Sequence, residues 1–177
     1  MKEKLKSMLN AQKEYNQLIF EKYECNYDKF TIENIRFALF DKLGELNHLF
    51  KSEWCWYKDS GYYGKATKND ILIAYTDCVC FMLTLVLMMK GTIHSITELC
   101  RDIENNYTKG SYYIGTSTLL YTLECMEYAQ CHDEVSYIFV SLLFLGYKLG
   151  FSFDDIYKAY NDRIEYYTYN LKLESGE

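Results

Sequence analysis

Residues 71–89 read ILIAYTDCVCFMLTLVLMM, an apolar run that is long enough to cross a bilayer and in which Asp77 is the only charged residue. A bare carboxylate in the middle of a membrane span would be expensive to bury. The rest of the chain also carries apolar faces that need a partner. We therefore predict that this run is the central buried helix of a soluble bundle, with Asp77 facing a polar cleft.

The segments on both sides of this run show apolar residues at helical spacing. We predict a first helix over residues 3–23 and a second over 31–53, where Thr31 is a good N-cap and Ile32, Ile35 and Leu39 recur every three or four positions. The central helix is expected to begin at residue 69 or 70 and to end at 91. Gly44, inside the second helix, suggests close packing against another backbone.

The C-terminal half shows the same helical character. Ser95 and Glu98 form a capping box that opens a short helix over residues 95–105, and Ser152 and Asp155 form another that opens a last helix over 152–171. Residues 116–150 are helical by pattern, with a break near residues 132–133. No strand alternation is present in the sequence, so the prediction is an all-α fold of about six helices.

Length and composition support a single helical domain over residues 1–177. The chain has 177 residues, a hydrophobic fraction of 49% and no proline, and the missing proline favours helices that end at glycine or at polar caps. Its net charge of −6 makes it a poor candidate for binding nucleic acid.

The seven cysteines are odd in number, scattered and without a CxxC pair, which indicates reduced thiols rather than disulfides or structural zinc. The N-terminal residues are charged and lack the apolar stretch of a secretory signal. We therefore expect a cytoplasmic location and no association with a membrane.

Acidic residues accompany the apolar stripes of the second and third helices. Asp41 and Glu45 are four positions apart, and Asp70 and Asp77 are seven apart, so each pair lies close to one side of its helix. Carboxylates on facing helices are how bundles hold hard cations such as Mg²⁺. Asp41 and Asp70 are also compatible with ordinary solvent-facing charges, whereas Glu45 and Asp77 lie nearer the core pattern.

Four stretches in this order resemble a known family. They are MLNAQKEYNQLI near the N-terminus, FALFDKLGELNHLFKSEWCWYK, DILIAYTDCVCFMLTLVL, and LGFSFDDIYKAYNDRIEYY near the C-terminus. Together they resemble the dimeric all-α dUTPases, within the wider superfamily of all-α nucleoside triphosphate pyrophosphatases. The resemblance implies a homodimer that binds a nucleotide, with Mg²⁺ held by a Glu-x-x-Glu motif on one helix and a Glu-x-x-Asp motif on the next.

The metal motifs match this pattern only in part. Glu45 and Asp77 match two of the four acids, but Lys42 and Ala74 stand where the other two are expected. In the closing helix Tyr160 and Arg163 match residues that approach the phosphates, whereas Ile164 and Tyr167 replace asparagines. The residues that resemble the nucleotide pocket are Gln12, Asn16, Trp54, Trp56, Lys58 and Phe81.

The departure at Lys42 has an electrostatic consequence. An ammonium group repels a divalent cation, since two unit charges about 4 Å apart interact by some 4 kcal/mol at an effective dielectric of 20. We expect Lys42 to lie between Glu45 and Asp77 in the place of the metal, and to pair with a nucleotide phosphate. The alternative is that Asp41 and Asp70 act as displaced ligands and restore a site of four carboxylates.

Three functions follow from these patterns. The first is a nucleotide-binding protein that captures a nucleotide or a nucleotide-derived signal without efficient hydrolysis; the residue usage makes a phage or low-GC bacterial source plausible. The second is a working Mg²⁺-dependent dUTP or dCTP pyrophosphatase, and the third is a protein-interaction module. No cofactor is expected for the first function, and Mg²⁺ is expected for the second.

Overall fold

The computed structural model describes residues 1–23, 30–51, 55–58, 64–89 and 132–173. Within these ranges the chain forms five helices and no strand, which confirms the all-α fold. The helices are α1 (Lys2–Tyr23), α2 (Ile32–His48), α4 (Lys68–Met88), α7 (His132–Lys148) and α8 (Phe153–Leu173). The predicted helix over 95–105 and the first part of the segment 116–150 lie outside the described residues.

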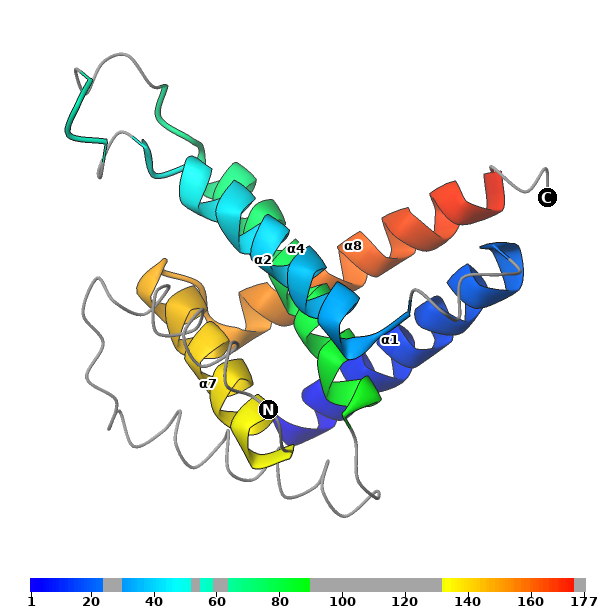
Figure 1. Ribbon diagram of the computed structural model, residues 1–177. Helices are drawn as coiled ribbons and strands as arrows, with labels where there is room; N and C mark the ends of the chain where they lie inside the picture. The colour runs from blue at the N-terminus through cyan, green and yellow to red at the C-terminus, as the bar shows by residue number, and fades with distance from the viewer. Residues whose placement is uncertain (24–29, 52–54, 59–63, 90–131, 174–177) are drawn as a thin grey trace.

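Helix α4 is the centre of the bundle, and the other four helices pack against it (Figure 1). It is buried almost continuously from Tyr75 to Val86. By length and composition α4 could cross a membrane, but 61% of its apolar window is buried inside the protein. The apolar run is therefore the central core helix, as its sequence predicts.

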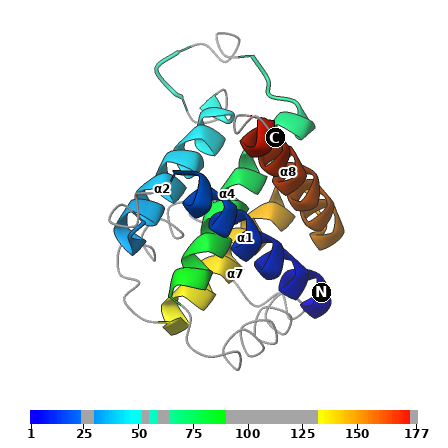
Figure 2. The same ribbon diagram turned by 90° about the vertical axis from the view of Figure 1, so that its right-hand side faces the viewer.

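The remaining four helices pack around α4. Helix α2 lies along α4, α1 and α8 lie beside each other and pack against α4, and α7 contacts α4 and α8 (Figures 1 and 2). Helices α1 and α8 run parallel, as two contacts show. Lys4 pairs with Asp154 near their beginnings, and the Lys22 ammonium donates to the carbonyl of Leu171 near their ends. This arrangement brings the C-terminal helix against the side of α4 that carries Asp77.

Side-chain caps mark the beginnings of three helices. The Thr31 hydroxyl accepts from the Asn34 amide at the start of α2, and Ser152 and Asp155 form the predicted capping box at α8. A further capping box joins Thr67 and Asp70, so α4 begins at Lys68, slightly before the predicted start.

The glycines behave differently from one another. Among the described residues, a Cβ atom at Gly44 would meet nothing within 4 Å, which contradicts the prediction of close backbone packing there. At Gly146 of α7, in contrast, a Cβ atom would lie 2.5 Å from the Tyr75 hydroxyl oxygen. This close approach lets Tyr75 of α4 donate to the carbonyl of Leu142 at 2.8 Å. Gly150 has a φ of 82° directly after α7, a conformation that favours glycine.

Candidate functional site

The most developed polar contact in the described residues is at Asp77, which α4 places in the core with only 6% of its surface exposed. Arg163 of α8 forms a two-pronged pair with it: Nε donates to Oδ1 at 2.6 Å, and Nη2 donates to Oδ2 at 2.7 Å. The Tyr167 hydroxyl, one turn further along α8, donates to Oδ1 at 2.7 Å. Both carboxylate oxygens are therefore engaged by donors of the same chain.

The electrostatics of this cluster follow from its burial. The pKa of Arg163 is raised, chiefly by its hydrogen bond to Asp77. The pKa of the Tyr167 hydroxyl is also raised, first by burial and then by its hydrogen bond to the carboxylate. Both groups therefore keep their protons at neutral pH and remain donors to Asp77. Fork-shaped pairs between a guanidinium and a carboxylate are among the strongest hydrogen-bonded pairs in proteins.

Lys42 of α2 pairs with the nearer acid of its own helix. Its ammonium nitrogen lies 2.7 Å from Oε1 of Glu45 and 3.9 Å from Oδ2 of Asp41. The pKa of Lys42 is raised, chiefly by the hydrogen bond to Glu45, with smaller contributions from the charges of Asp41 and Asp77. The expectation that Lys42 bridges Glu45 and Asp77 is thus corrected in part: it pairs with Glu45, and Arg163 is the cation that pairs with Asp77.

In the described part of the chain, the two carboxylates that match the metal motifs are not gathered with further metal-binding side chains. In the part of the chain that the structure describes, no three acidic, histidine or cysteine side chains gather where they could hold an ion. Glu45 and Asp77 each have a cation of the protein within hydrogen-bonding distance.

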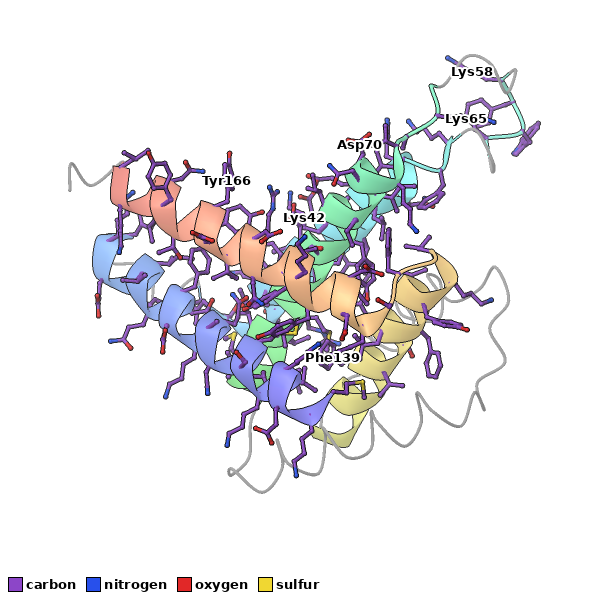
Figure 3. The ribbon with its side chains drawn as sticks, turned by 180° about the vertical axis from the view of Figure 1, so that it is seen from behind. Lys42, Lys58, Lys65, Asp70, Phe139 and Tyr166 are labelled. Atoms are coloured by element: carbon purple, nitrogen blue, oxygen red, sulfur yellow. The ribbon has the colours of Figure 1, made fainter. Side chains whose placement is uncertain are left out.

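The two acids considered as displaced ligands do not complete a metal site. Asp41 is exposed on the surface of α2, and Asp70 accepts hydrogen bonds from Thr67 at the start of α4, apart from Lys42 in Figure 3. The structure therefore does not gather the four carboxylates of the alternative hypothesis.

A second polar cluster joins α1, α4 and α8 inside the bundle. Gln12 is 2% exposed; its Nε2 donates to Asn16 Oδ1 at 3.0 Å, and its Oε1 lies 3.1 Å from the donating hydroxyl of Tyr160. The same hydroxyl lies 2.9 Å from the carbonyl of Met8, and Thr84 of α4 donates to Asn16. Three residues predicted to contact a nucleotide, Gln12, Asn16 and Tyr160, are therefore brought together.

Within this second cluster the three residues differ in how they could meet a ligand. Gln12 and Tyr160 are buried, whereas Asn16 is only partly buried. In this conformation Gln12 and Tyr160 hold the Asn16 side chain in place, and Asn16 is the member with access from outside.

A groove of about 460 Å³ lies between α4 and α8 and reaches Arg163. It is lined by Asn69, Leu72, Ile73 and Thr76 of α4 and by Asp155, Lys158, Ala159, Asp162, Arg163 and Tyr166 of α8. Its volume is within the range of small-molecule sites. Two cations and two carboxylates give the lining no net charge. Arg163 is the lining residue that also pairs with Asp77.

Residues 55–58, the described part of the segment after α2, lie apart from these clusters (Figure 3). Trp56 is 90% exposed, and Lys58 lies at the far end of the loop, away from Lys42 and Tyr166 (Figure 3). Trp54 lies outside the described residues. Phe81 of α4 is partly buried and packs against the core. The structure therefore does not bring Trp56 or Lys58 to the cluster around Asp77 within one chain.

Two contributors were not identified as site residues from the sequence. In the sequence, Tyr167 stands out only because it replaces an asparagine of the family pattern, and Thr84 lies inside the apolar run 71–89. The signal for Tyr167 was its spacing: it follows Arg163 by four positions, so both side chains lie on one side of α8. The cysteines Cys78 and Cys80 lie nearby, but burial raises their thiol pKa values, which makes them poor nucleophiles.

Comparison with known proteins agrees with this arrangement of helices. A sequence model of the dUTPase family matches residues 4–170, which is nearly the whole chain. No individually curated protein matches. The match covers the helices that carry Gln12, Glu45, Asp77 and Arg163. The chain therefore belongs to the dUTPase family, in its all-α form.

Proposed function

We propose that the protein binds a nucleotide or a nucleotide-derived signal in its dUTPase-like site and does not hydrolyse it efficiently. The observation that carries this proposal is the engagement of both Asp77 oxygens by Arg163 and Tyr167. Hydrolysis in this family is expected to need metal ions that neutralise phosphate oxygens and activate water. A carboxylate that already has three donors from its own chain is a poor ligand for such an ion.

Recognition of the nucleotide is assigned to the residues that the bundle brings together. Asn16, held by Gln12 and Thr84, is positioned to hydrogen-bond a base, and Tyr160 keeps Gln12 in place. Arg163 and Lys42 supply positive charge for phosphates, a role that a guanidinium fills well because of its planar set of donors. Phe81 of α4 is a further member of the proposed pocket.

A homodimer completes the proposal. Trp56 and Lys58 extend from the bundle on the loop after α2, and with Trp54 they would serve a nucleotide site only if that loop reached the second chain. We propose a cytoplasmic protein, phage-encoded or from a low-GC bacterium, that sequesters its ligand and does not bind nucleic acid.

The experiment combines thermal unfolding with product detection. The purified protein is mixed with dUTP, dCTP, other nucleoside triphosphates and cyclic or dinucleotide signals, each with Mg²⁺ and with EDTA. A ligand present at 100 times its dissociation constant should stabilise the folded state by about 2.7 kcal/mol. Stabilisation by at least one nucleotide without turnover is the expected result, and Asn16→Ala should remove it while Lys13→Ala on the same helix should not.

The other functions are separate outcomes of the same experiment. Mg²⁺-dependent turnover of roughly 1 per second or faster would show a working pyrophosphatase and contradict sequestration. The absence of any stabilisation by the whole panel would leave a protein-interaction module and contradict nucleotide binding.

A further inference from the structure

The pair between Asp77 and Arg163 joins residues 86 positions apart and lies between the central helix and the last helix. Asp77 is almost fully buried, and the side chain of Arg163 is 25% exposed. A buried carboxylate needs a counter-charge, and here the protein supplies one from α8. In an all-protein magnesium site the ion itself is that counter-charge.

Two departures from the family pattern favour a protein cation over a metal ion as the counter-charge of Asp77. At position 74, one helical turn before Asp77, alanine stands where the motif has glutamate, so no second carboxylate competes for the guanidinium. At position 167 a tyrosine stands where the pattern has asparagine, and its hydroxyl donates to Asp77 at 2.7 Å. The loss of one acid and the gain of one donor both favour an internal ion pair over a metal ion.

We propose that Arg163 is a built-in cation that takes the place of the divalent metal at Asp77 and excludes metal from this site. This inference deepens the proposed function, because it makes nucleotide binding independent of Mg²⁺. The guanidinium has five N–H donors and uses two of them on Asp77. The other three remain available to an anionic group, and Arg163 also lines the groove between α4 and α8.

The test measures Mn²⁺ binding without any nucleotide, by the loss of the free-ion paramagnetic resonance signal. Arg163→Gln removes the cation and keeps hydrogen-bonding capacity. Lys158→Gln is the matched control, since it removes a cation from the same helix and the same groove without touching Asp77. Arg163→Gln should bind Mn²⁺ at least about tenfold more tightly than the wild type. Lys158→Gln should bind it as the wild type does.

Equal Mn²⁺ affinity in the wild type and in folded Arg163→Gln would overturn the proposal, and so would an equal gain in Lys158→Gln. If Arg163→Gln does not fold, the wild type and Asp77→Asn decide the matter. The proposal predicts that the wild type binds Mn²⁺ weakly and that Asp77→Asn binds it with the same affinity. Loss of Mn²⁺ binding in Asp77→Asn would show that the wild type uses Asp77 as a metal ligand.

These results are independent of the proposed function. A protein that excludes Mn²⁺ as predicted but is stabilised by no nucleotide would leave the role of Arg163 standing and contradict nucleotide binding. A protein that binds nucleotides but also binds Mn²⁺ through Asp77 would leave nucleotide binding standing and contradict the role of Arg163.

Discussion

At the scale of single residues, Asp77 is a carboxylate buried in the apolar helix α4 and paired with Arg163 of α8. A charge inside an apolar helix predicts a partner, because burial of an unpaired carboxylate is costly. The sequence does not say which partner. Lys42 is near in the chain and has the right charge, but Glu45 takes its ammonium group, whereas Arg163 reaches Asp77 from the far end of the chain.

The ion pair should be visible in stability measurements. Arg163→Gln leaves Asp77 buried without its counter-charge and should lower the free energy of unfolding by about 3 kcal/mol. Asp77→Asn with Arg163→Gln should cost clearly less than the sum of the two single substitutions, because the double variant leaves no unpaired charge. Urea unfolding of the four proteins measures this coupling, and strict additivity would show that the two residues do not stabilise each other.

Tyr167 should contribute less than Arg163. Tyr167→Phe removes one donor to the Asp77 carboxylate and should lower the free energy of unfolding by about 1.5–2 kcal/mol, the lower part of the range for hydrogen bonds to charged groups. Tyr166→Phe is the control, since Tyr166 is 54% exposed and makes no hydrogen bond within the described residues. Equal effects of the two substitutions in the same unfolding assay would show that the hydrogen bond from Tyr167 to Asp77 does not stabilise the protein.

At the scale of helices, the side-chain caps at helix starts were more predictable than the contacts between helices. The capping boxes at Ser152 and Asp155 follow from local spacing alone. The box at Thr67 and Asp70 has the same spacing, but from the sequence Asp70 is considered only as a solvent-facing charge or as a displaced metal ligand, not as a cap. Close contacts between helices depend on which faces meet, and a single sequence does not contain that information. Gly44 and Gly146 illustrate this, because both lie in helices but, among the described residues, another helix comes within 4 Å of a Cβ atom at Gly146 and not at Gly44.

The two glycines should respond in opposite ways to alanine. Gly146→Ala would force its Cβ atom against the Tyr75 ring and should destabilise the protein by about 1–3 kcal/mol. Gly44→Ala meets nothing and should stabilise α2 by roughly 0.5–1 kcal/mol, through helix propensity. Thermal unfolding of both variants distinguishes these effects, and a stabilising Gly146→Ala would contradict the packing of α7 on α4.

The start of α4 should show a specific dependence on pH. Hydrogen bonds from Thr67 lower the pKa of Asp70 below its usual value of 3.8. A lowered folded-state pKa means that the stabilisation is present above the unfolded-state pKa, about 3.9, and is lost as the pH falls through the folded value.

Asp70→Asn should therefore lower the unfolding temperature at pH 7, and the difference from the wild type should disappear as the pH falls through the lowered pKa of Asp70. Asp162→Asn, an exposed aspartate inside α8, is the matched control. A difference between Asp70→Asn and the wild type that persists unchanged in acid would exclude the charged cap as its cause.

At the scale of the whole molecule, most of the fold could be predicted and only part of the site could. Helical periodicity and the apolar run at 71–89 were sufficient for an all-α bundle with α4 at its centre. The order of the motifs along the chain was sufficient to identify the dUTPase family. The meeting of Asp77 with Arg163 and Tyr167 requires α8 to lie parallel to α1 and against α4, a tertiary arrangement that no local pattern contains.

The central claim is that this site binds a nucleotide with the protein's own cations in the place of a metal. Isothermal titration calorimetry with dUTP, or with whichever nucleotide stabilises the protein most, tests it directly when performed once in EDTA and once in excess Mg²⁺. The account predicts dissociation constants that agree within about threefold, a difference of less than about 0.7 kcal/mol, and an intact nucleotide afterwards. Affinity that appears only with Mg²⁺, accompanied by release of the monophosphate, would contradict it.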